Sequence, residues 1–390
     1  MPLPICTPSR AAFLTGRFGS SNGVQFFGDK IHENIVTWPQ TMARNGYQTA
    51  MTGKWHNVRD GDYYGFEWTG NVFIAGMGPF TDQPMIQKFG EKPQLVKGNT
   101  TELYTDTALR FLDERDRDRP FFLYVAHQAP HDPRVPVPHY TDLYDPALMP
   151  LPPNFRPVPK FDPGTLDIRD ERLLPIPRPI PKLKLEIARY FGLISHLDAQ
   201  IGRLLRGLEE KGLADNTIVI FCGDNGLTLG AHGFLGKQTL HEEGIRIPLI
   251  IRHPRLRGQA GQTRDALVYL HDLMPTVCEW TGTPLPEGVQ GKSLVTVSEG
   301  TQPGVRDAVF GRYNERKVPL MRMIRTHRYK LIKYFKAERE ELFDLENDPY
   351  EMNDLSGDPD LQQVCNELRR RLIDWLVEQD DRIALDALER

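Results

Sequence analysis

Apolar residues along the chain form two kinds of pattern, short continuous runs and longer stretches with helical spacing. Continuous runs long enough for one buried strand cover residues 121–126, 217–222 and 247–252. Helical spacing covers residues 38–45, 101–115 and 183–211, and Gly212 ends the last of these. A further strand, interrupted by a glycine, is expected at 47–55. Strands that alternate with helices favour an α/β fold, with a mixed, mostly parallel sheet flanked by helices.

The pattern changes after about residue 300. Short strands joined by tight turns are expected at 309–312, 321–326 and 329–334, followed by a helix at 361–379. We therefore expect a main domain over 1–300 and a small C-terminal α+β subdomain over 301–390. Between 130 and 181 the chain is crowded with prolines, and long excursions of this kind often shape a substrate pocket.

Composition excludes several classes of protein. Of the 390 residues 39% are hydrophobic, enough for a large core, and the formal net charge of -4 gives no basic excess for binding nucleic acid. No run of about 18 apolar residues occurs, so no membrane span is expected. The four cysteines are too few and too scattered for a disulfide framework, and none has zinc-site spacing.

Cys6 is the first candidate functional residue along the chain. Residues 10–17 read as a short helix, with Thr7 as a plausible cap and Pro8 at the first helical position. Cys6 is therefore expected at a helix N-terminus, where free amides favour an anionic ligand. Arg10, one turn along, can direct its guanidinium to the same place.

Two further segments carry polar side chains in suggestive positions. Lys54 and His56 are two residues apart on an expected strand, so they face the same side and suit a divalent oxyanion. Asp224 and Asn225 follow a buried strand directly, and a carboxylate beside an amide oxygen suits Ca²⁺ or Mg²⁺. His127 and His131 follow another strand, and side-chain chemistry alone does not rank them.

These segments together resemble the sulfatase family, which has the alkaline-phosphatase-like fold. Residues 6–17 match its signature C-x-P-S-R-x-x-x-L-T-G-R at every position, residues 53–56 its GKWH motif, and residues 129–133 its APHxP pattern. Residues 224–237 resemble its DNG metal segment followed by LGxHGxxGK. The likeness covers nearly the whole chain and is strongest to the choline-sulfatase-like and polysaccharide-sulfatase branches.

The resemblance implies a mechanism for sulfate-ester hydrolysis. A separate maturation enzyme would oxidise Cys6 to formylglycine, whose hydrate attacks sulfur with a metal-bound hydroxyl and expels sulfate with the other. The metal, Ca²⁺ or alternatively Mg²⁺, would be held by Asp224, Asn225 and residue 6. The expected catalytic residues are Cys6, Arg10, Lys54, His56, His131 and Lys237. His131 would protonate the leaving alcohol, while His127 and His232 are expected to be structural or to support the pocket.

Alternatives remain open at this point. The family places two metal-binding aspartates at the end of a strand ahead of the cysteine, so an upstream strand is expected to be missing here, in a fragment or in a true short product. A phosphonate or phosphate monoester hydrolase shares the first motif, and an inactive truncated homologue would bind sulfated glycans. The expected partners are a sulfated small molecule or glycan and the maturation enzyme, and the sequence names neither the substrate nor the compartment.

Overall fold

A three-stranded parallel sheet forms the centre of the molecule. The structure is a computed structural model that describes residues 3–57, 64–316 and 318–388. Strand β1 (Gln48–Lys54) lies between β2 (Trp68–Phe73) and β5 (Phe121–Ala126) and is parallel to both. Successive residues of β1 face opposite sides, so Ala50 and Met51 enter two different apolar clusters. This sheet confirms the α/β architecture.

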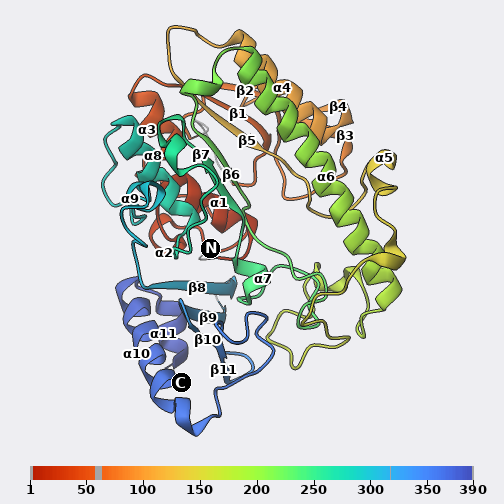
Figure 1. The fold of residues 1–390 in the computed structure, drawn as a ribbon, viewed down its shortest axis with the longest axis vertical. Helices are drawn as coiled ribbons and strands as arrows, with labels where there is room; N and C mark the ends of the chain where they lie inside the picture. Colours follow the sequence, from red (N-terminus) through yellow and green to blue (C-terminus); the bar gives the residue numbers. More distant parts are fainter. Residues whose placement is uncertain (1–2, 58–63, 317, 389–390) are drawn as a thin grey trace.

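Helices cover both faces of this sheet (Figure 1). On one side α4 (Thr100–Glu114) packs on the strands and the long α6 (Ile180–Glu210) packs on α4. On the other side lie α1 (Cys6–Thr15), α3 (Trp38–Arg44) and α8 (Leu273–Thr281). The start of α3 is fixed by a capping box in which Thr37 and Gln40 satisfy one another's backbone amides. Helices α3, α4 and α6 agree with the expected ones to within a few residues, whereas α1 begins four residues earlier than expected and α8 was not predicted.

Strands β6 (Val219–Cys222) and β7 (Leu249–Arg252) depart from the expectation of buried parallel strands. They pair with each other in antiparallel fashion, and both are shorter than the apolar runs that predicted them. Ile250 is 64% exposed and Phe221 36%. Within the described residues β6 and β7 form a two-stranded sheet, so neither has a neighbour on its second edge to cover it.

The C-terminal part contains a four-stranded antiparallel sheet in the order β11-β10-β9-β8. Its strands are β8 (Ala308–Glu315), β9 (Val318–Thr326), β10 (Tyr329–Tyr334) and β11 (Arg339–Asp344). Helix α10 (Gln362–Glu378) packs its apolar face on this sheet, beside α11 (Arg382–Leu388). The sequence missed β11 because its charged residues obscure the alternation, and Glu341 is in fact buried. The division at residue 300 stays a prediction.

The remaining elements are small. A hairpin that the sequence did not predict pairs β3 (Thr81–Met85) with β4 (Gln94–Asn99). Short helices lie at α2 (Gly19–Asn22), α5 (Pro138–Thr141), α7 (Glu242–Ile245) and α9 (Val295–Glu299). The proline-rich segment 130–181 contains α5, two short 3-10 turns at Pro146–Leu148 and Glu171–Leu173, and the start of α6. None of the described helices has both the length and the apolar character that crossing a bilayer requires.

Candidate active site

Cys6 is the first residue of helix α1, as expected, although the cap differs from the prediction. Ile5 occupies the N-cap position with an extended backbone and no side-chain cap bond. Thr7 lies inside the first turn, and its buried hydroxyl makes no hydrogen bond with any described residue. The predicted positions of the cap, at Thr7, and of the first helical residue, at Pro8, were therefore wrong by two residues, because the helix begins earlier. Cys6 still lies at the helix N-terminus, where the first-turn amides have no partner within the helix, and the residue is 2% exposed.

Cationic and imidazole groups from three distant segments meet at the Cys6 sulfur. Lys237 Nζ lies 3.7 Å from Sγ, and Lys54, His131 and His56 act on it as well. Burial raises the pKa of the Cys6 thiol, but the two ammonium groups and the two imidazoles outweigh burial and hold that pKa well below its usual value. The site therefore stabilises an anion at the side chain of residue 6.

Lys54 reaches the site from the last position of β1. Gly53 precedes it with a φ of 102°, and a Cβ at Gly53 would lie 2.2 Å from the carbonyl oxygen of Ala126 on β5. Only glycine permits this close approach of the two strands. Burial lowers the pKa of Lys54 to about 8, against the opposing effect of Cys6. The ammonium is thus held in a dry position where it gains by pairing with an anion.

Lys237 and His131 are in direct contact beside Cys6. Lys237 Nζ lies 3.0 Å from His131 Nε2, while His131 Nδ1 lies 2.8 Å from the carbonyl oxygen of Asp132. An ammonium can only donate and a carbonyl can only accept, so the proton of neutral His131 lies on Nδ1. Burial and Lys237 lower the pKa of His131 to about 4. In the free site His131 is therefore neutral.

His56 lies just beyond the end of β1, next to the cysteine. Its ring stacks on Phe27 at 5.6 Å between centroids, and Gly76 leaves the space that the ring occupies, since a Cβ there would lie 2.5 Å from it. Burial lowers the pKa of His56, and a hydrogen bond with Cys6 opposes the shift. His56 Nδ1 is buried with no hydrogen-bond partner among the described residues.

Arg10 links the cysteine helix to the end of β6. Its Nε donates to Asp224 Oδ2 across 2.7 Å, and its NH1 donates to the carbonyl oxygen of Lys54 and to Tyr124 Oη. Burial alone would raise the pKa of Asp224, but Arg10 together with Lys54 and Lys237 outweighs burial and lowers that pKa, so the carboxyl stays ionised. The sequence missed Tyr124, which it assigned to an apolar strand. The phenol was the signal available, because a buried tyrosine hydroxyl needs a polar partner.

Asp224 and Asn225 suit a hard divalent cation. Asn225 Nδ2 donates to the carbonyl oxygen of Gly226, whereas Asn225 Oδ1 is buried and unpartnered among the described residues. A buried amide oxygen without a donor beside an ionised carboxylate fits a cation that takes oxygen ligands. Two side-chain oxygens are fewer than the roughly six that Ca²⁺ or Mg²⁺ takes, so other oxygen atoms must complete the shell.

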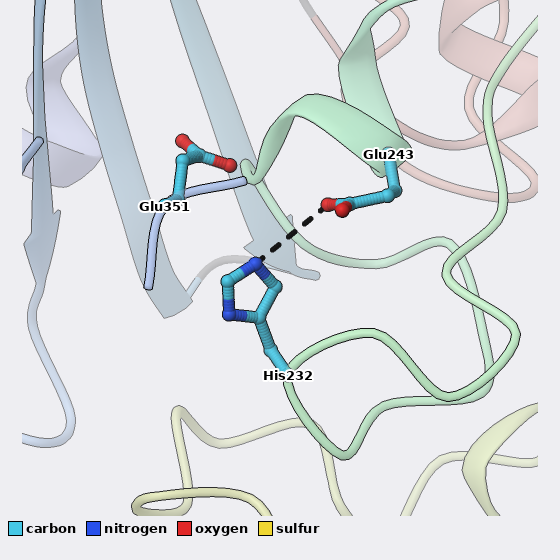
Figure 2. Close-up of side chains that lie close together, drawn as sticks. All are labelled: His232, Glu243 and Glu351. Atoms are coloured by element: carbon cyan, nitrogen blue, oxygen red, sulfur yellow. Dashed lines mark ion pairs between the residues drawn. The ribbon is translucent and has the colours of Figure 1, made fainter. Parts of the chain in front are cut away.

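A second cluster of ligand-type side chains contains none of the site residues described so far (Figure 2). It contains His232, Glu243 and Glu351, whose ligand atoms lie within 4.8 Å of one another. Asn154 Nδ2 is 2.9 Å from His232 Nε2 and 2.6 Å from Glu243 Oε1. Lys330 Nζ is 2.6 Å from Glu351 Oε1. Because these protein donors already approach all three side chains, we interpret the cluster as a polar contact between the 228–245 loop and the C-terminal sheet.

The two histidines left open by the sequence both lie outside the group around Cys6. His232 stacks on His241 at 3.9 Å between ring centroids. His127 lies near Tyr104, and burial lowers its pKa to about 4. No hydrogen bond from either imidazole to Cys6 is present within the described part of the chain. The side chains of Cys6, Lys54, His56, His131 and Lys237, by contrast, form one site, to which Arg10 joins Asp224.

Comparison with known proteins finds sulfatases. A family model described as "Sulfatase" matches residues 3–283, and one described as "N-sulphoglucosamine sulphohydrolase, C-terminal" matches residues 230–378. An N-acetylglucosamine-6-O-sulfatase of Bacteroides thetaiotaomicron is 30% identical, over 94% of this chain and 76% of its own. A choline-sulfatase of Rhizobium meliloti is 29% identical, over 91% and 74%. A solved structure in complex with its substrate, D-glucosamine-2-N,6-O-disulfate, superposes with a TM-score of 0.84 at 27% identity, covering 97% of this chain and 89% of that one.

Proposed function

The chain belongs to the sulfatase family and hydrolyses sulfate esters, and from this premise we propose that Cys6, oxidised to formylglycine by a maturation enzyme, is the reacting residue. The observation that carries the proposal is the burial of Cys6 among cationic and imidazole groups, with Lys237 Nζ 3.7 Å from Sγ. An aldehyde there supplies, once hydrated, one hydroxyl that attacks sulfur and another that helps to expel sulfate. The thiol of the structure stands in for those hydroxyls.

Lys54 and Lys237 are the residues proposed to bind the sulfate oxygens. Both ammonium groups are buried and both act on the residue 6 side chain, so a sulfate held against that residue lies within their reach. In a site without water their attraction for the charge that spreads over the oxygens is strong. Arg10 already donates to Asp224 and to the Lys54 carbonyl, so its proposed role includes orienting these groups as well as contributing charge.

His131 is proposed to protonate the leaving alcohol, with His56 closer to residue 6. In the free site Lys237 donates to His131 Nε2 and helps to keep the imidazole neutral. A bound sulfate ester brings negative charge beside both side chains. That charge draws the Lys237 ammonium to itself and favours protonation of His131, which then has a proton to give.

The family implies a metal ion, and we propose that Asp224, Asn225 and residue 6 hold it. Ca²⁺ is the first candidate and Mg²⁺ the second, because the side chains offer only oxygen ligands. A cation there makes a neighbouring hydroxyl more acidic and offsets charge on sulfate. Asp224 contributes a carboxylate that Arg10 orients, and Asn225 a buried amide oxygen.

A sulfated sugar is the proposed class of substrate. The names of two similar proteins support it, one an N-acetylglucosamine-6-O-sulfatase and the other solved with a sulfated glucosamine. Because a choline-sulfatase is also among the similar proteins, a small alkyl sulfate is the second candidate substrate. Turnover of 6-O-sulfated N-acetylglucosamine against choline sulfate separates the two.

The test of the proposed function uses protein co-expressed with a maturation enzyme. Peptide mass analysis is expected to show an aldehyde at residue 6, and kcat/KM is expected to be higher for an aryl sulfate than for an aryl phosphonate. A clear preference for the phosphonate would move the protein to phosphonate monoester hydrolysis. Absence of the aldehyde, with binding but no turnover of a sulfated glycan, would identify a binding protein.

A further inference from the structure

Three consecutive residues of the proline-rich segment contact the residues next to His131 and the residues next to Lys237. These residues are Arg169, Asp170 and Glu171, at the start of the 3-10 turn Glu171–Leu173. They are more than 30 residues away from His131 and more than 60 from Lys237 in the chain. The string of these three residues adds to the resemblance to the choline-sulfatase-like and polysaccharide-sulfatase branches, but it indicates no role for them, and the roles proposed above do not use them.

The first contact holds His131. Arg169 forms ion pairs with Asp132 through NH2 and with Asp170 through NH1, so its planar guanidinium bridges two carboxylates. Asp132 follows His131 directly, and both its carbonyl oxygen and its carboxylate face His131 Nδ1, the carboxylate oxygen at 3.3 Å. The side chains of Asp132 and Asp170 are 9% and 8% exposed. Arg169 therefore fixes the group that orients the His131 ring.

The second contact holds the backbone next to Lys237. Glu171 accepts hydrogen bonds from the amides of Leu235 and Gly236, the latter at 2.7 Å. Arg178 pairs with the Glu171 carboxylate and also donates to the carbonyl oxygen of Gly233 at 2.9 Å. Glu171 and Arg178 are both almost completely buried. The turn that presents Lys237 is thus anchored at several backbone atoms by a charged pair that has no access to water.

Between these contacts the segment approaches the turn closely. A Cβ on Gly236 would lie 2.8 Å from Asp170 Cβ, and the carboxylate of Asp170 acts electrostatically on Lys237. The two anchored side chains then meet at 3.0 Å between Lys237 Nζ and His131 Nε2. One short segment therefore sets the relative position of two groups that come from different parts of the chain.

We propose that Arg169, Asp170 and Glu171 form a positioning clamp that holds the side chains of His131 and Lys237 in the relative position needed to bind a sulfate group. The clamp rests on the proposed function, since it acts through two residues assigned there to the sulfate. The three residues are positioning residues, because they act through Asp132, through the electrostatic effect on Lys237 and through the backbone next to Lys237. A displacement of about 1 Å at groups of this kind costs roughly a hundredfold in rate.

Kinetics of Arg169→Ala test the His131 side of the clamp. The side chain of Arg169 is 38% exposed, so the variant is expected to fold. We expect KM for an aryl sulfate to rise and kcat/KM to fall by about 10- to 100-fold. Arg169→Lys, which keeps one positive charge but not the fork, is expected to recover part of the loss. A variant that was only less stable would lower the active fraction and leave KM unchanged.

Arg172→Ala is the matched control. Arg172 lies in the same turn, is exposed, and makes no side-chain hydrogen bond or ion pair with any described residue. Its kcat/KM is expected to stay within about twofold of the unaltered protein. Equal kinetics for Arg169→Ala and Arg172→Ala, or an unchanged KM in both, would overturn the clamp.

Hydrogen exchange tests the Lys237 side without any need for turnover. Glu171→Gln, which removes the charge that holds the amides of Leu235 and Gly236, is expected to speed exchange in residues 233–238 and to leave β9 and β10 unchanged. Equal exchange in the folded variant and the unaltered protein would overturn the clamp even if sulfate hydrolysis were established. Absence of hydrolysis in the unaltered protein would instead overturn the proposed function, and the exchange result would still decide the clamp.

Discussion

Arg10 and Asp224, 214 residues apart in the chain, are joined by a hydrogen bond of 2.7 Å between Nε and Oδ2. This bond fastens the helix that begins with Cys6 to the end of strand β6. It leaves Asp224 Oδ1 as the carboxylate oxygen available to a cation, and Oδ1 of the following residue, Asn225, has no hydrogen-bond partner among the described residues. The proposed reacting residue and the proposed metal ligands are therefore held in fixed positions relative to one another.

The first prediction concerns the metal. Asp224→Asn removes the only charge among the proposed side-chain ligands, so affinity for Ca²⁺ or Mg²⁺ is expected to fall by at least about tenfold in a calorimetric titration. Asp215→Asn is the control, because Asp215 lies just before the same strand, is 87% exposed and pairs with Arg257. Equal affinities for the two variants would place the cation elsewhere, and His232→Ala then tests the second cluster.

The second prediction concerns Cys6. Cys6→Ala removes the only side chain that can carry the aldehyde in the proposed site, so turnover of an aryl sulfate is expected to fall more than about a thousandfold. Cys278→Ala is the control, since this thiol is buried in the apolar cluster around α8. A substantial residual rate in Cys6→Ala would remove residue 6 from the reaction.

The third prediction concerns the pH dependence of substrate capture. Burial lowers the pKa of Lys54 to about 8, so the ammonium is present below that pH and is lost as the pH rises through it. Because the profile of kcat/KM reports groups of the free enzyme, kcat/KM is expected to decline above about pH 8. Lys54→Arg, whose guanidinium stays charged, is expected to move this decline to higher pH. A decline at the same pH in both proteins would assign it to another group.

The fourth prediction concerns stability in acid. Burial lowers the pKa of both His127 and His271 to about 4, from 6.5. Between these values the unfolded chain binds more protons than the folded one, so the free energy of unfolding falls as the pH is lowered from about 6.5 towards 4. Each histidine contributes a slope of up to about 1.4 kcal/mol per pH unit.

Urea unfolding at pH 7 and pH 5 measures this slope. The glutamine in His271→Gln cannot be protonated in either state, so this variant is expected to reduce the slope by the contribution of one histidine. His139→Gln, at an exposed position, is expected to leave it unchanged. A slope that does not differ between the two variants would show that His271 is protonated equally in the folded and the unfolded chain.

The longer helices and the central strands β1 and β5 were predictable because their signals are local. Residues 121–126 become β5 without a change of boundary, and the helix expected at 38–45 ends one residue earlier, at Arg44. Strands β2, β3, β4 and β11 were missed, because a strand that carries polar side chains resembles a loop when the burial of those side chains is unknown. Thr7 was misjudged as a cap because a preference for capping does not say where a helix begins.

Sequence alone determined the family and the α/β class and predicted the reactive residues, because the string around Cys6 and the segments with Lys54, His131 and Lys237 carry their chemistry in residue type and spacing. Tertiary structure alone decided that Arg10 orients Asp224, that Lys237 contacts His131, and that Arg169 and Glu171 hold the latter pair from outside. Such contacts join segments tens to hundreds of residues apart. They depend on how the strands and turns pack, and no local pattern of apolar and polar residues records that packing.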